Sequence, residues 1–120
     1  MRLRAAGVVL AAWLSGCSAA DGPTVDRIEP TQATRGTMVT VHGEGFCGDG
    51  RAAGDGACSS LPPGAVDFGL ELPMARALVL AWSDVAIDVE VPAAARVGAT
   101  DVIVTVDGRS SNGGAFEVLP

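Results

Sequence analysis

The chain has 120 residues, with 14 Asp or Glu against 8 Lys or Arg, so its formal net charge is −6 at pH 7. An acidic chain without a basic stripe is a poor match for nucleic acid, and it lacks the positive patch that attracts proteins to anionic lipids. Its length is that of a single domain, close to the size of one β-sandwich.

The first sixteen residues predict an export signal. Arg2 and Arg4 precede an uncharged apolar run from residue 5 to residue 14. As a helix this run would reach about 15 Å, which is half the thickness of a bilayer core. It is therefore too short for a stable membrane-spanning helix. Basic residues followed by a short apolar run are typical of a secretory signal that is later removed.

The end of the apolar run resembles the lipobox of bacterial lipoproteins, because Leu14, Ser15 and Gly16 precede Cys17. The resemblance implies that the Cys17 thiol takes a diacylglycerol and that the chain is cut before Cys17. It also implies that the new amine is open to acylation, for example with palmitate. Two or three acyl chains anchor a protein durably, whereas one chain is marginal. The alternative is an ordinary signal peptide with an incidental cysteine.

Ser18 bears on where the anchored protein would reside. In lipoproteins of enteric type, Asp at this place holds the protein in the inner membrane, so the resemblance favours the outer membrane of the cell envelope. Residues 17–22 are predicted to be a short lipidated tether, because they are small or polar. A folded domain is expected over residues 23–120.

The domain is predicted to be all-β, because its short apolar stretches alternate with period two and are separated by Gly, Pro and Asp. Residues 85–91 are the clearest strand, with Val and Ile facing inward and Asp88 and Glu90 facing outward. About seven strands in a chain of this length are typical of an immunoglobulin-like β-sandwich, with a small barrel as the alternative. The expected strands are residues 24–28, 38–43, 65–68, 75–82, 85–91, 101–108 and 115–119.

The predicted core consists of the apolar side chains that these strands would turn inward. It comprises Val25, Ile28, Val39, Val41, Phe46, Phe68, Leu78, Leu80, Trp82, Val85, Ile87, Val89, Val102, Val104, Val106, Phe116 and Val118.

The segment 47–64 is expected to be a long loop, because it has no periodicity and many turn residues. It contains Cys47 and Cys58, which in an exported chain are most simply one disulfide once Cys17 carries lipid. Such a bond would contribute on the order of 2–3 kcal/mol. Loops on rigid sandwiches commonly carry recognition, so this loop is the predicted contact surface.

Residues 23–120 resemble IPT/TIG domains, the immunoglobulin-like fold shared by plexins and transcription factors. Later motifs of the family correspond to residues 66–69, 82–92 and 102–120, whereas most members are much tighter than this chain at 47–64. We expect Gly43 and Gly45 to permit a bend with positive φ. The opening motif is Pro23, Val25, Ile28, Pro30, Gly36, Val39, Thr40, Val41, Gly43, Gly45 and Phe46.

Motifs for nucleotide or metal binding are incomplete. Residues 43–48 fit G-x-G-x-x-G formally, but a dinucleotide site needs a helix there to face the pyrophosphate. Asp49 and Asp55 lack the oxygen ligands that a calcium loop has at its third and fifth places. His42 with the two loop cysteines matches no common zinc spacing. We therefore expect no metal and no cofactor.

Catalysis is not expected either. The chain has no Gly-x-Ser-x-Gly elbow, and His42, its one histidine, is predicted to lie on an outward strand face. Asp88 and Glu90 are spaced for a glycosidase pair only in principle, since a domain of this size leaves no obvious cleft for a sugar. The sequence therefore predicts a non-enzymatic protein.

The expected function is that of a lipid-anchored envelope lipoprotein, a binding, adhesion or spacer module for a protein or polysaccharide partner. A carbohydrate-binding accessory module and an accessory domain to an enzyme on a neighbouring chain are the alternatives. Sugar sites usually present exposed aromatic rings, and an exposed Trp82 would favour the carbohydrate reading. The aromatic residues after Cys17 nevertheless all fit core places: Phe46, Phe68, Trp82 and Phe116.

Overall fold

The computed structural model describes residues 22–48, 58, 64–70 and 74–120. Within these ranges the chain forms ten strands and no helix. The strands are β1 (Thr24–Glu29), β2 (Gln32–Thr34), β3 (Met38–Glu44), β4 (Gly64–Phe68), β5 (Ala75–Arg76), β6 (Leu78–Trp82), β7 (Ala86–Glu90), β8 (Gly98–Val106), β9 (Arg109–Ser110) and β10 (Gly114–Leu119).

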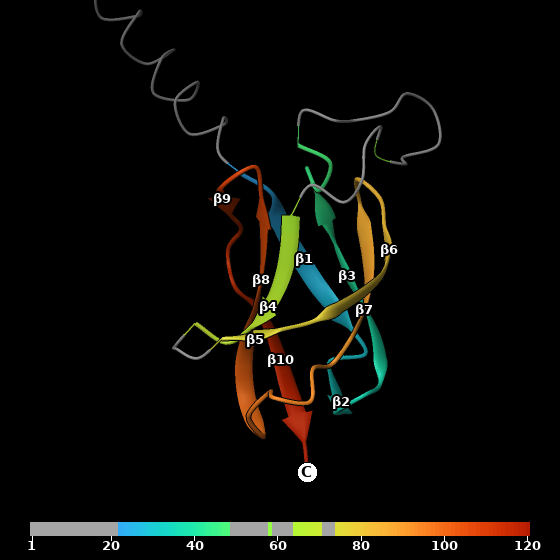
Figure 1. The fold of residues 1–120 in the computed structure, drawn as a ribbon, viewed down its shortest axis with the longest axis vertical. Helices are drawn as coiled ribbons and strands as arrows, with labels where there is room; N and C mark the ends of the chain where they lie inside the picture. Colours follow the sequence, from blue (N-terminus) through green and yellow to red (C-terminus); the bar gives the residue numbers. More distant parts are fainter. Residues whose placement is uncertain (1–21, 49–57, 59–63, 71–73) are drawn as a thin grey trace, which may run out of the picture.

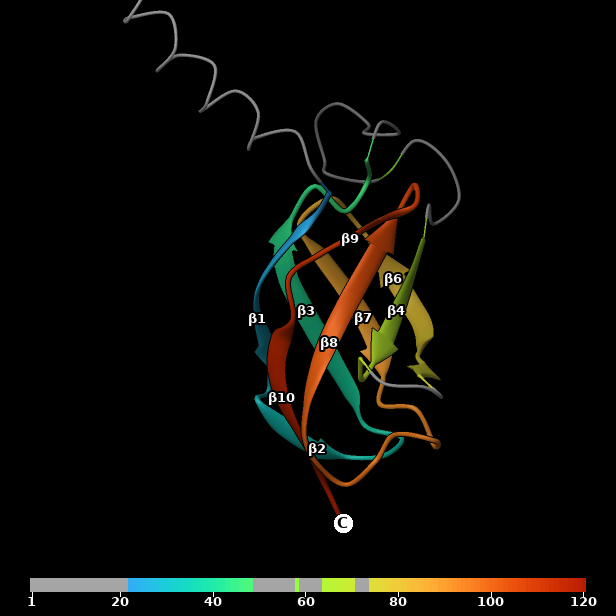
Figure 2. The ribbon, with the colours of Figure 1, turned by 90° about the vertical axis from the view of Figure 1, so that its left-hand side faces the viewer.

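The strands form two sheets that pack face to face, as the two layers of Figure 2 show. The first sheet has the order β1-β3-β7-β6, and the second has the order β2-β10-β8-β4-β5, with β9 paired to β8. Pairing is antiparallel throughout except between β2 and β10, which are parallel. β1 begins and β3 ends at one end of the sandwich, whereas β2 and the C-terminus lie at the other (Figure 1). The predicted all-β architecture is confirmed.

The core lies between the sheets and is built mainly from β-branched residues, which suit a pleated, buried surface. Val41, Val66, Ile87 and Val104 are completely buried. The rings of Phe68 and Phe116 meet edge to face, with centroids 5.5 Å apart. Burying each such side chain contributes about 1.5–3 kcal/mol relative to leaving it exposed, so the core is the main source of stability.

The sequence prediction was wrong about which side of β6 faces inward. Leu78 and Leu80 are 60% and 48% exposed, whereas Ala77 is buried and Val79 packs against the core. The register of β6 against β7 also shifts between Val79 and Ala81, which breaks the alternation. A continuous apolar run carries no period-two signal, so it does not reveal the inward face.

The inward face of β7 was predicted correctly except at its start. Ile87, Val89 and Val91 are buried, and Asp88 and Glu90 lie on the opposite face, half-buried. Val85 is 54% exposed, because it lies in the turn before β7 rather than in the strand.

Two glycines before the 47–64 segment have different roles. Gly45 has a φ of 76°, the left-handed conformation that was expected there. Gly43 does not have a positive φ, so that part of the prediction was wrong. A Cβ at Gly43 would overlap the carbonyl oxygen of Thr24 and lie 2.6 Å from the ring of Phe46. Gly43 is therefore required by close packing of β3 against β1.

Asn112 joins the two sheets at the end where β1 begins. Its side-chain amide donates to the carbonyl oxygen of Val25 at 2.9 Å, and its Oδ1 accepts from the Val25 amide at 2.8 Å. The Asn112 side chain thus pairs with β1 as the backbone of a neighbouring strand would.

Candidate functional site

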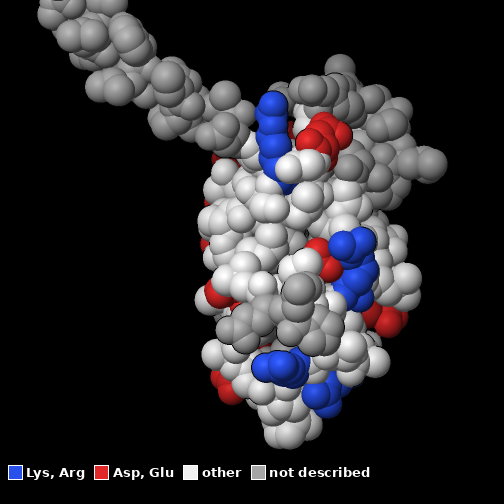
Figure 3. Space-filling model, turned by 60° about the vertical axis from the view of Figure 1, so that its left-hand side comes forward, with Lys and Arg blue, Asp and Glu red and all other residues white. Residues whose placement is uncertain are grey.

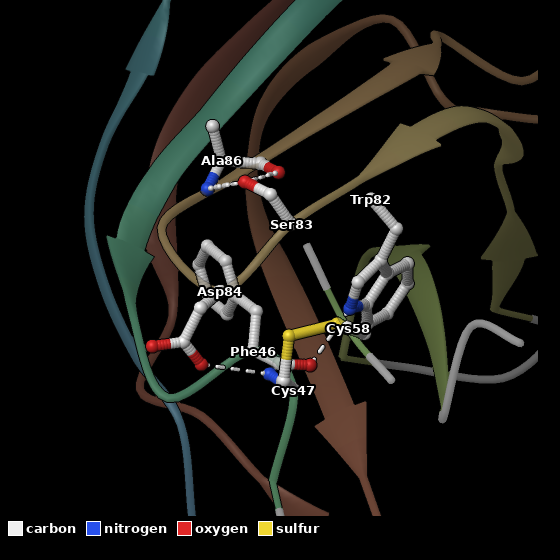
Figure 4. The surroundings of a disulfide bond; sticks show 7 residues. All are labelled: Phe46, Cys47, Cys58, Trp82, Ser83, Asp84 and Ala86. Atoms are coloured by element: carbon white, nitrogen blue, oxygen red, sulfur yellow. Dashed lines mark hydrogen bonds between the residues drawn. A yellow bond between two sulfur atoms is a disulfide. The ribbon is translucent and has the colours of Figure 1, made fainter. Parts of the chain in front are cut away.

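A disulfide between Cys47 and Cys58 closes the base of the predicted contact loop (Figure 4). The two Cα atoms are 5.1 Å apart, and the bond spans 11 residues of sequence. Cys47 is completely buried, as is its neighbour Phe46. The predicted pairing is confirmed, and it fixes the end of β3 to the far side of the loop.

Trp82 supports the disulfide from the end of β6. Its indole Nε1 donates to the carbonyl oxygen of Phe46 at 2.7 Å, and its ring is half-buried against the core (Figure 4). The donor is therefore already used, and the ring is not the fully exposed platform that a sugar stacks on. Trp82 was predicted to lie in the core, whereas in the structure it is half-buried and packs against the core from its edge.

The turn between β6 and β7 holds the same region from the other side. Asp84 accepts the Cys47 amide at Oδ1, at 3.1 Å, and its carbonyl oxygen accepts the Phe46 amide at 3.0 Å. Ser83 closes this turn with hydrogen bonds to both backbone groups of Ala86 (Figure 4). Three chain segments that are distant in sequence thus form one rigid base beneath the loop.

Several predicted residues lie outside the described part of the chain. They include Cys17, the predicted lipidation site, together with most of the 47–64 loop and its Asp49 and Asp55. Of that loop the structure describes Cys47, Gly48, Cys58 and Gly64. The role of the loop as a contact surface and the lipidation of Cys17 therefore stay predictions.

His42 and Asp88 each pair with a neighbouring side chain near the surface. His42 Nε2 lies 3.0 Å from Glu29 Oε1, and Asp88 accepts the Thr40 hydroxyl at 2.7 Å. Among the described residues, no three His, Cys, Asp or Glu side chains come together to hold a metal ion. The described part of the chain contains no helix that is long and apolar enough to span a membrane.

A hollow that the sequence did not predict lies at the opposite end of the molecule from the disulfide. It has a volume of about 360 Å³ and is lined by Arg35, Arg76, Leu78, Glu90, Val91 and Pro92, among others. These residues come from the β2–β3 loop, the β5–β6 junction and the end of β7. Because they are scattered along the chain, no local motif could have identified them. We call this site the arginine hollow.

Arg76 is bound on one edge of the arginine hollow by a buried carboxylate. Its Nε donates to Asp67 Oδ1 at 2.8 Å, and Asp67 is 5% exposed. The hydrogen bond to Asp67, and then the attraction of that charge, raise the pKa of Arg76 above its ordinary value. Burial of the carboxylate is therefore compensated by a charged partner, as a buried ion requires.

No protein-family model matches this chain, and no curated protein matches it by sequence. Solved structures do match. The gamma-CGTase from alkalophilic Bacillus clarkii is 27% identical with a TM-score of 0.62, over 82% of this chain and 12% of that chain. A structural genomics protein of unknown function from Bacteroides thetaiotaomicron is 19% identical with a TM-score of 0.65, over 83% of this chain and 22% of that chain.

The described chain thus corresponds to a small part of each of these larger proteins. Both superpositions agree with the two antiparallel layers described above, and the chain has an immunoglobulin-like β-sandwich fold. The finer resemblance to IPT/TIG domains stays a prediction.

Proposed function

We propose that this chain is a lipid-anchored module of the bacterial envelope that binds or displays and does not catalyse. The match to 12% of the gamma-CGTase, which covers 82% of this chain, supports the module, whereas the anchor rests on the sequence around Cys17. Almost the whole chain therefore superposes on one small part of a large enzyme.

The position of the first strand gives the anchored module an orientation. Thr24 pairs with Glu44, and a Cβ at Gly45 would contact Pro23. The folded chain therefore starts at the same end as the disulfide base. The tether 17–22 reaches at most about 20 Å even when fully extended. A lipid on Cys17 would therefore hold this end close to the membrane and turn the opposite end, with the arginine hollow, toward partners.

Intact-mass analysis of the chain purified from bacterial membranes tests the anchor. We expect a product that starts at Cys17 and carries the mass of two or three acyl chains. The Cys17→Ser variant is the control, and it should keep residues 1–16 or lose membrane association. A wild-type product that starts at Met1, or a trimmed product without acyl mass, would refute the anchor and with it the orientation.

A carbohydrate-binding module is the second candidate function, because the gamma-CGTase is a carbohydrate-active enzyme. Stacking on aromatic rings is not the expected mode of such binding. Phe46, Phe68 and Phe116 are buried, and Trp82 is half-buried with its N–H in use. A sugar site on the described surface would have to rely on charged and polar groups, and titration with soluble oligosaccharides tests whether one exists.

A further inference from the structure

We propose that the arginine hollow binds the carboxylate groups of an acidic polysaccharide, one that contains uronic acid residues. The proposal rests on the non-catalytic binding role above, but it does not depend on the lipid anchor. The hollow measures about 360 Å³, within the range of small-ligand sites. All of its lining residues belong to the described chain.

Both arginines of the hollow are held in place on one edge and have donors left on the other. Arg35 Nε donates to the carbonyl oxygen of Ala95 at 2.8 Å, and Arg76 Nε donates to Asp67 at 2.8 Å. Arg76 Nη2 also lies 3.3 Å from Asp67 Oδ2. A guanidinium has five N–H donors in a fixed plane, so N–H groups remain on each side chain. Fixing each plane in advance lowers the entropy lost on binding a carboxylate.

The charge of the hollow contrasts with that of the whole chain. The chain has a net charge of −6, whereas the two arginines that line this site are balanced by Glu90 in the lining and by Asp67, which pairs with Arg76. Figure 3 shows arginine side chains over the upper, middle and lower parts of one face, with acidic side chains near them. On an acidic protein, a site without net negative charge repels anions less than the rest of the surface does.

Glu90 and the apolar lining favour a sugar acid over an acidic peptide. A uronic acid residue carries hydroxyl groups beside its carboxylate, so Glu90 can accept from a hydroxyl while the arginines hold the carboxylate. Leu78 and Pro92 supply an apolar surface for the C–H face of the ring. A glutamate side chain has no hydroxyl group beside its carboxylate, so an acidic peptide would offer Glu90 no such donor.

Calorimetric titration of the full chain tests the proposal. The chain is kept in a polyoxyethylene detergent, which contributes neither charge nor sugar. The probes are an oligogalacturonate, a neutral maltooligosaccharide of the same length and an oligoglutamate with the same number of carboxylates. We expect the oligogalacturonate to bind at least about tenfold more tightly than either of the others. We also expect its affinity to fall as salt is added.

Substitutions connect the binding to the hollow. Arg35→Gln and Arg76→Gln should each weaken oligogalacturonate binding by about tenfold or more, because each removes a charged guanidinium group that can donate two hydrogen bonds to one carboxylate. Arg35→Lys keeps the charge but loses the planar fork, so its affinity should lie between those of Arg35→Gln and the unmodified chain. Arg27→Gln is the matched control. Arg27 is an exposed arginine on β1, at the other edge of the same sheet from β6, and its loss should leave affinity unchanged.

Arg76→Gln leaves Asp67 buried without its ion pair and can impair folding, so Arg35→Lys and a thermal unfolding curve keep the test decisive. Equal affinity among Arg35→Gln, Arg35→Lys and the unmodified chain would overturn the site. Equal binding of the oligoglutamate or of the maltooligosaccharide would overturn the ligand class. Acyl mass at Cys17 is measured separately, so failure of the anchor is distinguishable from failure of the hollow.

Discussion

β6 and β7 are neighbours in one sheet, and both are five residues long, yet they bury their side chains differently. β7 lies between β3 and β6 and alternates strictly, with Ile87 and Val89 inward and acids outward. β6 pairs only with β7 among the described strands and exposes two leucines. Packing against the core determines which side chains the central strand β7 buries. The edge strand β6 is instead anchored at its ends.

The difference between the two strands shows where apolar residues carry structural information. In β7 an apolar residue is buried because every second position faces the second sheet. In β6 the sequence Leu-Val-Leu-Ala-Trp is apolar throughout, and only Val79 and Trp82 pack against the core. Apolar character alone is therefore a weak guide to burial at a sheet edge, where single exposed apolar residues are common.

Truncation at the centre of β7 should have the largest effect. Ile87 is completely buried, so Ile87→Ala loses its packing and leaves a cavity, at a cost of about 2–5 kcal/mol in the free energy of unfolding. Urea denaturation followed by tryptophan fluorescence measures this value. Leu80→Ala is the comparison on β6, and we expect a cost below about 1 kcal/mol. Similar losses for the two variants would contradict the assignment of β6 as an exposed edge.

Loss of the disulfide should have the next largest effect. Replacing Cys47 and Cys58 together with alanine frees the loop between them and should lower the free energy of unfolding by about 2–3 kcal/mol. Unfolding with and without a reductant gives the same comparison in the unmodified chain. If neither treatment lowers stability, the Trp82 and Asp84 contacts alone hold the end of β3.

The anchor at the end of β6 can be tested through one hydrogen bond. Trp82→Phe removes the indole N–H and leaves the carbonyl oxygen of Phe46 without its 2.7 Å donor. We expect a loss of about 1–3 kcal/mol, because an unpaired and partly buried acceptor is costly. Hydrogen exchange should accelerate at the end of β6 and stay unchanged in β8. Exchange that rises equally in both strands would mean that Trp82 supports the core in general.

Much of the fold could be predicted from the sequence because β3 and β7 alternate clearly between apolar and polar residues. The short strands could not be predicted. β2 has three residues, and its parallel pairing with β10 joins segments about as far apart as the chain allows. The inward face of β6 could not be predicted either, because the register shift after Val79 interrupts the alternation of inward and outward side chains.

The disulfide and the arginine hollow also differ in whether the sequence could predict them. Cys47 and Cys58 could be paired from the sequence because, on the prediction that the chain is exported and Cys17 is lipidated, the two remaining thiols leave one simple arrangement. The arginine hollow could not be predicted, because Arg35, Arg76 and Glu90 are separated by many residues and none belongs to a motif. Only the folded sandwich brings the β2–β3 loop, the β5–β6 junction and the end of β7 together.

The smallest expected effect separates two adjacent residues of β6. Leu80 is 48% exposed, whereas Val79 packs against the core. Leu80→Thr introduces a β-branched residue suited to a strand and should change the free energy of unfolding by no more than about 0.5 kcal/mol. Val79→Thr places a hydroxyl against apolar neighbours and should cost about 1–3 kcal/mol. Because Leu80 makes the edge apolar, Leu80→Thr should also lower light scattering at high protein concentration. A larger loss at Leu80 than at Val79 would reverse the assigned faces of β6.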